Sequence, residues 1–156
     1  GGLDTISGLG MQVIHLTGPA DFKAIQANYT DASLPNAVLA FCHEMQLAYT
    51  AADIAIARSG ASSLAELSAF SLPTILVPFP YATDDHQTLN ARVYEDCGAA
   101  KILKEDSMQA RSLGMLLDEL TEMDGAALKK MATAMDAMAI RNAAENICRS
   151  IEERCR

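Results

Sequence analysis

The fold is decided by the stretch Ile54-Ala-Ile-Ala-Arg-Ser-Gly-Ala-Ser-Ser-Leu-Ala-Glu66. Its apolar beginning predicts a buried strand over Ile54–Ala57, the pair Ser59-Gly60 predicts a turn, and Ser62-Ser63 predicts the start of a helix. A strand that leads through a short turn into a helix is the repeating unit of a parallel α/β sheet. The first amides of such a helix have no partner within it, so they favour an anion, typically a phosphate.

Glu66 lies one helical turn beyond that helix start. A carboxylate at this place can accept hydrogen bonds from the two hydroxyls of a ribose, so the stretch indicates a nucleotide site. A second interpretation is a capping box formed by Ser63 and Glu66, in which the two residues satisfy each other's backbone amides and bind no ligand. The motif alone leaves both interpretations open.

The rest of the chain alternates short apolar runs with helical patterns. The predicted strands are Met11–Leu16, Ala37–Phe41, Ile54–Ala57, Thr74–Val77 and Ala100–Leu103. The predicted helices between them are Asp21–Tyr29, Met45–Ala51, Ser63–Phe70 and Gln87–Asp96. After Leu103 the pattern is helical, with a break at Gly125 and a last helix over Asn142–Glu153. We therefore expect an α/β fold: a Rossmann-like parallel sheet with helices on both faces, followed by C-terminal helices.

The beginning of the chain departs from the usual pattern of such folds. A doubly wound nucleotide-binding domain normally starts with a strand, a glycine-rich turn and a helix. Only Gly1–Gly10 precedes the first predicted strand, so we expect the usual first strand and helix to be lacking. That strand is normally central, and its loss leaves either a gap or a direct pairing of Met11–Leu16 with Ile54–Ala57. Unpaired backbone groups at a gap would favour self-association.

Composition excludes several classes of function. The 156 residues carry a net charge of −8, which argues against a nucleic-acid partner. No apolar run approaches the length of a membrane span, and no charged-then-apolar leader begins the chain, so we expect a cytoplasmic protein. The cysteines are scattered, which argues against a zinc site: Cys42, Cys97, Cys148 and Cys155. The length predicts a single domain over residues 1–156.

A polar loop, Phe79–Asn90, follows the fourth predicted strand. Ligands of open parallel sheets lie beyond the carboxyl ends of strands, so this loop and Ser59–Ser63 are expected to face one crevice. The loop carries side chains that can read sugar hydroxyls: Asp84, Asp85, His86, Gln87 and Asn90. We expect no metal here, because adjacent residues rarely converge on one ion without further ligands. Another interpretation is that Asp84 or Asp85 caps the helix that follows.

Four spaced motifs together closely resemble the C-terminal domain of the MurG family of GT-B glycosyltransferases. They are Arg58-Ser-Gly-Ala-x-x-x-x-Glu66, Leu72-Pro-x-x-x-Val77-Pro, Asp85-His-Gln-x-x-Asn-Ala91 and Gly98-Ala-Ala100. That family transfers N-acetylglucosamine from UDP-GlcNAc to lipid I at the inner face of the bacterial plasma membrane, making lipid II for peptidoglycan. The resemblance implies a UDP-GlcNAc-dependent hexosyltransferase domain, peripheral on that membrane, with UDP-GlcNAc as donor substrate and no cofactor. UDP-glucose differs at one substituent and remains an alternative donor.

The resemblance also assigns site residues to the parts of the donor. Glu66 would hold the ribose, and the segment Ser59-Gly60-Ala61-Ser62-Ser63 would contact the diphosphate and sugar. The hexose would be read by His86 and Gln87, with Asn90 in support. The backbone of Phe41-Cys42 would pair with uracil, with Phe41 or Met45 packing on the ring. Arg58 would either anchor its loop or offset phosphate charge.

Two departures from the family pattern limit what this chain can do. The family has a glycine-rich Gly-Gly-Ser-x-Gly-Ala loop, whereas this chain begins Gly1-Gly2-Leu3-Asp4. The acceptor-binding domain, which reaches lipid I and holds the general base, has no counterpart in the sequence. We expect His15 to be a hydrogen-bonded core histidine rather than that base. The isolated chain should therefore bind UDP-sugar weakly, contain no catalytic residue and transfer nothing.

Three other functions compete with this interpretation. One is a donor-binding subunit of a two-chain UDP-GlcNAc transferase, favoured by the Asp84–Gln87 loop but not by Gly98-Ala-Ala100. Another is a UDP-GlcNAc epimerase, which would be expected to show paired glutamates where Ala65 precedes Glu66. The third is a non-catalytic fragment that merely folds and self-associates.

Overall fold

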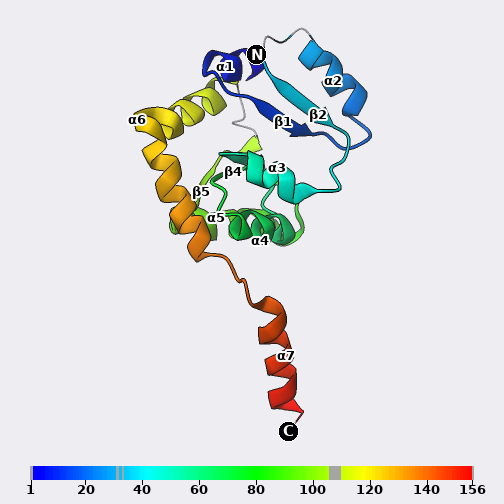
Figure 1. Cartoon of the computed structure of the whole chain (residues 1–156), viewed down its shortest axis with the longest axis vertical. Helices are drawn as coiled ribbons and strands as arrows, with labels where there is room; N and C mark the ends of the chain where they lie inside the picture. Colours follow the sequence, from blue (N-terminus) through cyan, green and yellow to red (C-terminus); the bar gives the residue numbers. More distant parts are fainter. Residues whose placement is uncertain (1, 31, 33, 106–109, 156) are drawn as a thin grey trace.

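The computed structural model describes residues 2–30, 32, 34–105 and 110–155 as an α/β fold (Figure 1). In chain order the elements are α1 (Gly2–Gly8), β1 (Val13–Leu16), α2 (Phe22–Thr30), β2 (Asn36–Leu39), α3 (Met45–Ala51), β3 (Ala55–Ala57), α4 (Ala61–Ala69), β4 (Thr74–Leu76), the 3₁₀ turn η1 (Thr83–Asp85), α5 (His86–Asp96), β5 (Ala100–Ile102), α6 (Ala110–Ala137) and α7 (Ala143–Arg154). All strand pairs are parallel, so the predicted fold class is confirmed.

The larger sheet has the order β3-β4-β5 and carries most of the core. Its central strand is completely covered, because Thr74, Ile75 and Leu76 are all buried. Ile75 packs with leucines of α6 on one face of the sheet. Leu76 packs with Leu64 of α4 and Ala91 of α5 in a second cluster. Helices therefore cover both faces of this sheet, as the continuous apolar strand predicts.

The smaller sheet consists of β1 and β2, with Val13 paired to Asn36 and Leu16 to Leu39. Among the described residues, β1 pairs only with β2, and β3 pairs only with β4. Of the two arrangements expected for a lacking first strand, the gap is therefore correct, and direct pairing of β1 with β3 is wrong. Ile14 of β1 and Ile56 of β3, the two strands on either side of this gap, have exposed side chains.

The first helix, α1, has no counterpart among the predicted elements. It packs against α6, and its Ile6 contacts the core cluster that contains Ile75. The approach is so close that a Cβ added at Gly114 would lie 2.3 Å from Cγ2 of Thr5. Because real side chains do not come that close, any larger residue at position 114 would force the Thr5 side chain, or the two helices, to shift.

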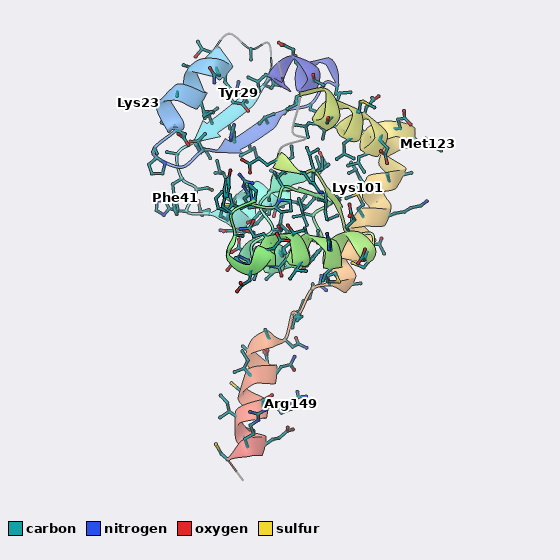
Figure 2. The ribbon with its side chains drawn as sticks, turned by 180° about the vertical axis from the view of Figure 1, so that it is seen from behind. Lys23, Tyr29, Phe41, Lys101, Met123 and Arg149 are labelled. Atoms are coloured by element: carbon teal, nitrogen blue, oxygen red, sulfur yellow. The ribbon has the colours of Figure 1, made fainter. Side chains whose placement is uncertain are left out.

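The C-terminal part differs from the prediction at one point. The break expected at Gly125 is not a helix end, because α6 runs through Ala110–Ala137. Met123 and Gly125 nevertheless have φ values of 53° and 68°, so the helix changes direction there (Figure 1). Beyond it, α7 extends away from the body and contains no buried residue; its Arg149 is labelled in Figure 2. None of the described helices combines the length and apolarity needed to cross a membrane.

Candidate functional site

The start of α4 is not closed by a side chain. Gly60 is the N-cap residue, with extended φ and ψ of −69° and 144°, and no side chain makes a capping hydrogen bond there. The amide of Leu64 donates to the carbonyl of Gly60 over 3.0 Å and begins the helical ladder. The three amides before it, those of Ala61, Ser62 and Ser63, form the first turn, where helical amides have no intrahelical partner. This turn is the arrangement that favours an anion.

The capping-box interpretation of Ser63 and Glu66 is wrong. It requires Ser63 to be the N-cap residue, but Ser63 is the third residue of α4. Glu66 instead accepts a hydrogen bond from the hydroxyl of Tyr49, with Oη and Oε2 separated by 2.8 Å. Glu66 is solvent-exposed, so its carboxylate lies on the surface of α4 where a ligand can reach it.

Tyr49 is a residue that sequence reasoning missed. It lies on α3, seventeen positions before Glu66 and outside every motif. Partial burial, with the hydrogen bond and charge of Glu66 adding to it, raises the pKa of Tyr49 to about 12. The tyrosine is therefore a protonated donor throughout the physiological pH range. The pattern offered no signal for it beyond an aromatic side chain one turn after Met45.

Hydrogen bonds join the two loops that the sequence predicted to share a crevice. Ser59 Oγ donates to the backbone oxygen of Gln87 over 2.8 Å. Asn90 Nδ2 donates to the backbone oxygen of Ser59 over 3.1 Å. Within the second loop, the amide of Phe79 donates to Oε1 of Gln87 over 3.0 Å. The predicted proximity of the α4 start and the Phe79–Asn90 loop is thus confirmed.

In these bonds, the side chains of three candidate site residues help to hold the loops in place. Ser59 is completely buried: its hydroxyl holds the loop, its backbone oxygen accepts from Asn90, and no part of it is exposed to a ligand. Gln87 uses its carbonyl oxygen for Phe79, and its amide group is a further donor. Asn90 uses its amide group for Ser59, and its carbonyl oxygen is a further acceptor.

Arg58 has the contacts of a loop anchor. Its Nη1 donates to the carbonyls of Val77 and Pro78, each over 3.2 Å, and forms an ion pair with Glu105 over 2.6 Å. Its guanidinium also lies 5.4 Å from the centre of the Phe79 ring. Of the two roles predicted for Arg58, the structure supports anchoring the ends of β3 and β4 to each other. The positive charge of Arg58 is paired with the carboxylate of Glu105.

The two aspartates of the loop occupy an unusual backbone conformation. Asp84 and Asp85 have φ values of 52° and 53°, in the left-handed region that is costly for residues other than glycine. Asp85 is the N-cap residue of α5, but its side chain makes no capping hydrogen bond, so the predicted capping bond is wrong for it. His86 then begins the helix. Within the described residues, no three side chains of the metal-binding types gather closely enough to hold an ion.

The third predicted part of the site is the segment Phe41–Met45, which leads into α3. Phe41 is 68% exposed at the edge of the molecule, and its ring meets that of His43 edge-on at 4.8 Å (Figure 2). Cys42 and Met45 are half-buried. No hydrogen bond places this segment directly on the α4 start in the described structure. The connection runs through Tyr49, one turn beyond Met45 on the same helix.

His15 lies elsewhere, in the β1–β2 sheet. Its Nδ1 is 3.0 Å from the hydroxyl of Tyr29, and burial lowers the pKa of its imidazole below the ordinary value. The predicted hydrogen bond of His15 is confirmed, but the side chain is only half-buried and belongs to neither core cluster. The cysteines of the chain are all free thiols.

Comparison with known proteins agrees with this geometry. The family model of the glycosyltransferase family 28 C-terminal domain matches residues 3–147. A protein of Chromohalobacter salexigens named UDP-N-acetylglucosamine--N-acetylmuramyl-(pentapeptide) pyrophosphoryl-undecaprenol N-acetylglucosamine transferase is 42% identical over 86% of this chain and 36% of its own length. A protein of the same name from Solibacter usitatus is 36% identical over 94% of this chain and 40% of its own length.

A solved structure points to the same family as these sequence relatives. The crystal structure of Acinetobacter baumannii MurG superposes with a TM-score of 0.83 at 35% identity, over 91% of this chain and 43% of that one. The chain therefore spans about two fifths of the length of these relatives. Since the family model covers nearly all of it, this chain belongs to the glycosyltransferase family 28 C-terminal domain family.

Proposed function

We propose that this chain is the UDP-GlcNAc-binding domain of an inverting N-acetylglucosaminyltransferase that converts lipid I to lipid II in peptidoglycan synthesis. The observation that carries the proposal is the uncapped start of α4, joined by hydrogen bonds to the Phe79–Asn90 loop. An anion site beside a polar loop suits a donor made of a diphosphate and a sugar. The names of the relatives supply the reaction.

In this reaction the domain stabilises the leaving group. A hydroxyl of the lipid-linked sugar attacks the anomeric carbon, the bond from that carbon to the diphosphate oxygen breaks, and the attacking hydroxyl loses its proton to a base outside this chain. Negative charge grows on the departing UDP. Preformed amides of Ala61, Ser62 and Ser63 at the start of α4 meet that charge, an effect typically worth a few kcal/mol.

The remaining candidate residues hold the other parts of the donor. Glu66 accepts the ribose hydroxyls, and the segment Phe41-Cys42 with Met45 receives the uracil ring. His86 and Gln87 read the hexose. UDP-GlcNAc is the donor substrate, no cofactor is needed, and lipid I is held by the further part of the longer relatives. The full-length protein then works at the cytoplasmic face of the plasma membrane.

Calorimetric titration of the chain with UDP and with ADP tests the proposal. We expect weak binding of UDP, with a dissociation constant on the order of 0.1–1 mM, and weaker binding of ADP. Glu66→Gln should weaken UDP about tenfold or more, because hydrogen bonds to a charged acceptor are lost. The matched control is Glu152→Gln on the distant helix α7, which should change nothing. Equal binding of UDP and ADP, or no binding, would contradict the proposal.

The isolated chain should also make no lipid II, because the acceptor and the base belong to the remainder of the enzyme. Lipid II synthesis by the chain alone would contradict this division of labour. An assay with lipid I in detergent and radiolabelled UDP-GlcNAc measures it directly.

The gap between β1 and β3 supports a further proposal, self-association. Each of these strands has one pairing partner in the described structure, and Ile14 and Ile56 are exposed beside the gap. Open strand edges with apolar side chains pair readily with another chain, here a second copy. Sedimentation velocity should show a concentration-dependent dimer. A strictly monomeric species at millimolar concentration would rule the proposal out.

A further inference from the structure

Tyr49 of α3 touches α4 at two points. Its hydroxyl donates to Oε2 of Glu66 over 2.8 Å. Its ring lies 5.3 Å from the ring of Phe70, tilted by 40°. Glu66 and Phe70 are four residues apart and so share one face of α4. The tyrosine therefore holds both the carboxylate and the helix that carries it.

The helix of Tyr49 is also the helix that follows the candidate base-binding segment. Met45 begins α3, four residues before Tyr49, and Phe41 lies just upstream. A contact at Tyr49 thus links the segment expected to receive the base with the residue expected to receive the ribose. In a nucleoside these two groups are joined by one glycosidic bond, so the spacing of their binding sites must be fixed.

We propose that Tyr49 is a positioning residue for nucleoside recognition: it orients the Glu66 carboxylate toward the ribose and sets the distance from that carboxylate to the base-binding segment. This inference rests on the proposed function, because it assigns the ribose to Glu66. A tyrosine hydroxyl has one proton to donate and takes up one acceptor position of the carboxylate. The other oxygen, Oε1, and the remaining lone pairs of Oε2 stay available for the two ribose hydroxyls.

The physical gain is preorganisation. A surface glutamate that rotates freely must be fixed when it binds a ligand, and fixing a rotamer-rich side chain weakens binding. Tyr49 fixes Glu66 before the ligand arrives. Its pKa of about 12 keeps the donor proton in place at every pH at which the enzyme would work.

The test is Tyr49→Phe, which removes the hydroxyl and keeps the ring on Phe70. Dissociation constants for UDP and for 2′,3′-dideoxy-UDP are measured by NMR titration. We expect a three- to tenfold loss for UDP, and no loss for the dideoxy analogue, which has no hydroxyl for Glu66. The matched control is Tyr94→Phe, since the Tyr94 hydroxyl is 3.1 Å from Ser68 Oγ on the same helix, α4. It should leave the affinity for UDP unchanged.

The hydrogen bond itself is measured without nucleotide, by following tyrosinate absorbance as the pH is raised. Glu66→Gln should lower the pKa of Tyr49 from about 12 toward the ordinary value, because the negative charge beside the hydroxyl is removed. A titration curve unchanged by Glu66→Gln would overturn the inference.

The binding outcomes separate the two proposals. Should the unmodified chain bind UDP while Tyr49→Phe binds it equally well, the inference fails and the proposed function stands. Equal losses for UDP and the dideoxy analogue would show a general structural role and would also overturn the inference. Failure of the unmodified chain to bind UDP refutes the proposed function and, with it, the assignment of Tyr49.

Discussion

The two sheets of this protein are made of similar residues and are buried to different degrees. In β4 every side chain from Thr74 to Leu76 is buried, whereas in β1 Ile14 is 44% and Leu16 is 38% exposed. The difference lies in their neighbours. β4 has a strand on each edge and helices on both faces, whereas β1 has, among the residues that the structure describes, a strand on one edge only. An apolar strand is buried by what surrounds it, and its own sequence does not guarantee that burial.

Most of the candidate site lies beside the larger, better-buried sheet. The α4 start and the Phe79–Asn90 loop lie at the ends of β3 and β4, in the half with the complete core. That half can hold loops at fixed distances through bonds such as Ser59 to Gln87. A site that must meet a developing charge needs such rigidity.

The largest effect should come from equal truncations in the two sheets. Leu76→Ala at the end of β4 removes a fully buried side chain and should lower the free energy of unfolding by roughly 2–5 kcal/mol. Leu16→Ala at the end of β1 removes a partly exposed one and should lower it by about 1 kcal/mol or less. Urea denaturation of both variants measures the difference. Equal losses would show that the β1–β2 half is packed as firmly as the other.

A smaller effect should come from the bond between the loops. Ser59→Ala removes the hydrogen bond from a buried hydroxyl to the backbone oxygen of Gln87, which should cost about 0.5–1.5 kcal/mol. Ser62→Ala is the control, because Ser62 is exposed on the first turn of α4 and should change stability by about 0.5 kcal/mol at most. Chemical denaturation of both variants gives the values. If the two serines prove equivalent, the Ser59 bond does not hold the loops together.

Local sequence patterns were enough to predict most elements of both halves. α3 has the predicted bounds Met45–Ala51, and the predicted strand Thr74–Val77 differs from β4 by one residue. The stretch Ile54–Glu66 was also assigned correctly as a strand that leads into a helix, although the connection at Ser59-Gly60 is extended and is not a turn. Periodicity and turn residues act over a few positions, so a pattern reports them directly.

The error in the capping box is local, whereas two features missing from the predictions, the α1–α6 packing and the Tyr49–Glu66 bond, depend on contacts between distant residues. The capping box failed because α4 begins two residues earlier than expected, at Ala61. The packing of α1 on α6 depends on Gly114 and Thr5, which no local pattern connects. The Tyr49–Glu66 bond joins two helices in the same way. Such pairs are fixed by tertiary packing, which one sequence does not encode in any short window.

The ion pair of Arg58 and Glu105 should contribute little, although it lies beside the site. Both side chains are nearly half exposed, so Glu105→Gln should lower the free energy of unfolding by about 0–1 kcal/mol, and less at high salt. Denaturation at low and high ionic strength measures it. The comparison sharpens the role of Arg58: its bonds to Val77 and Pro78 would remain and would keep β3 and β4 anchored. A loss well above this range would mean that Glu105 holds Arg58 in place.

The smallest effect is the pH dependence of stability that His15 contributes from the β1–β2 sheet. Burial lowers the pKa of His15 in the folded chain, so the unfolded chain takes up the proton first as the pH falls. The stabilisation from neutral His15 is therefore fully present above the ordinary histidine pKa of about 6.5, and is lost as the pH falls through the folded pKa. Stability of the unmodified chain should drop more between pH 8 and pH 5 than that of His15→Gln. If the stability of both proteins fell equally between pH 8 and pH 5, His15 would not be the group responsible.

Amide hydrogen exchange measures which strands are destabilised when His15 is protonated. If the β1–β2 half opens by itself, protonation of His15 should accelerate exchange in β1 and β2 and leave β4 unchanged. If the chain unfolds only as a whole, all strands should respond together. The first result is expected, because in the described structure β1 and β2 pair only with each other, and their Leu16 and Leu39 are exposed. The second would mean that the hydrogen bond of His15 to Tyr29 belongs to the same cooperative unit as the core around β4.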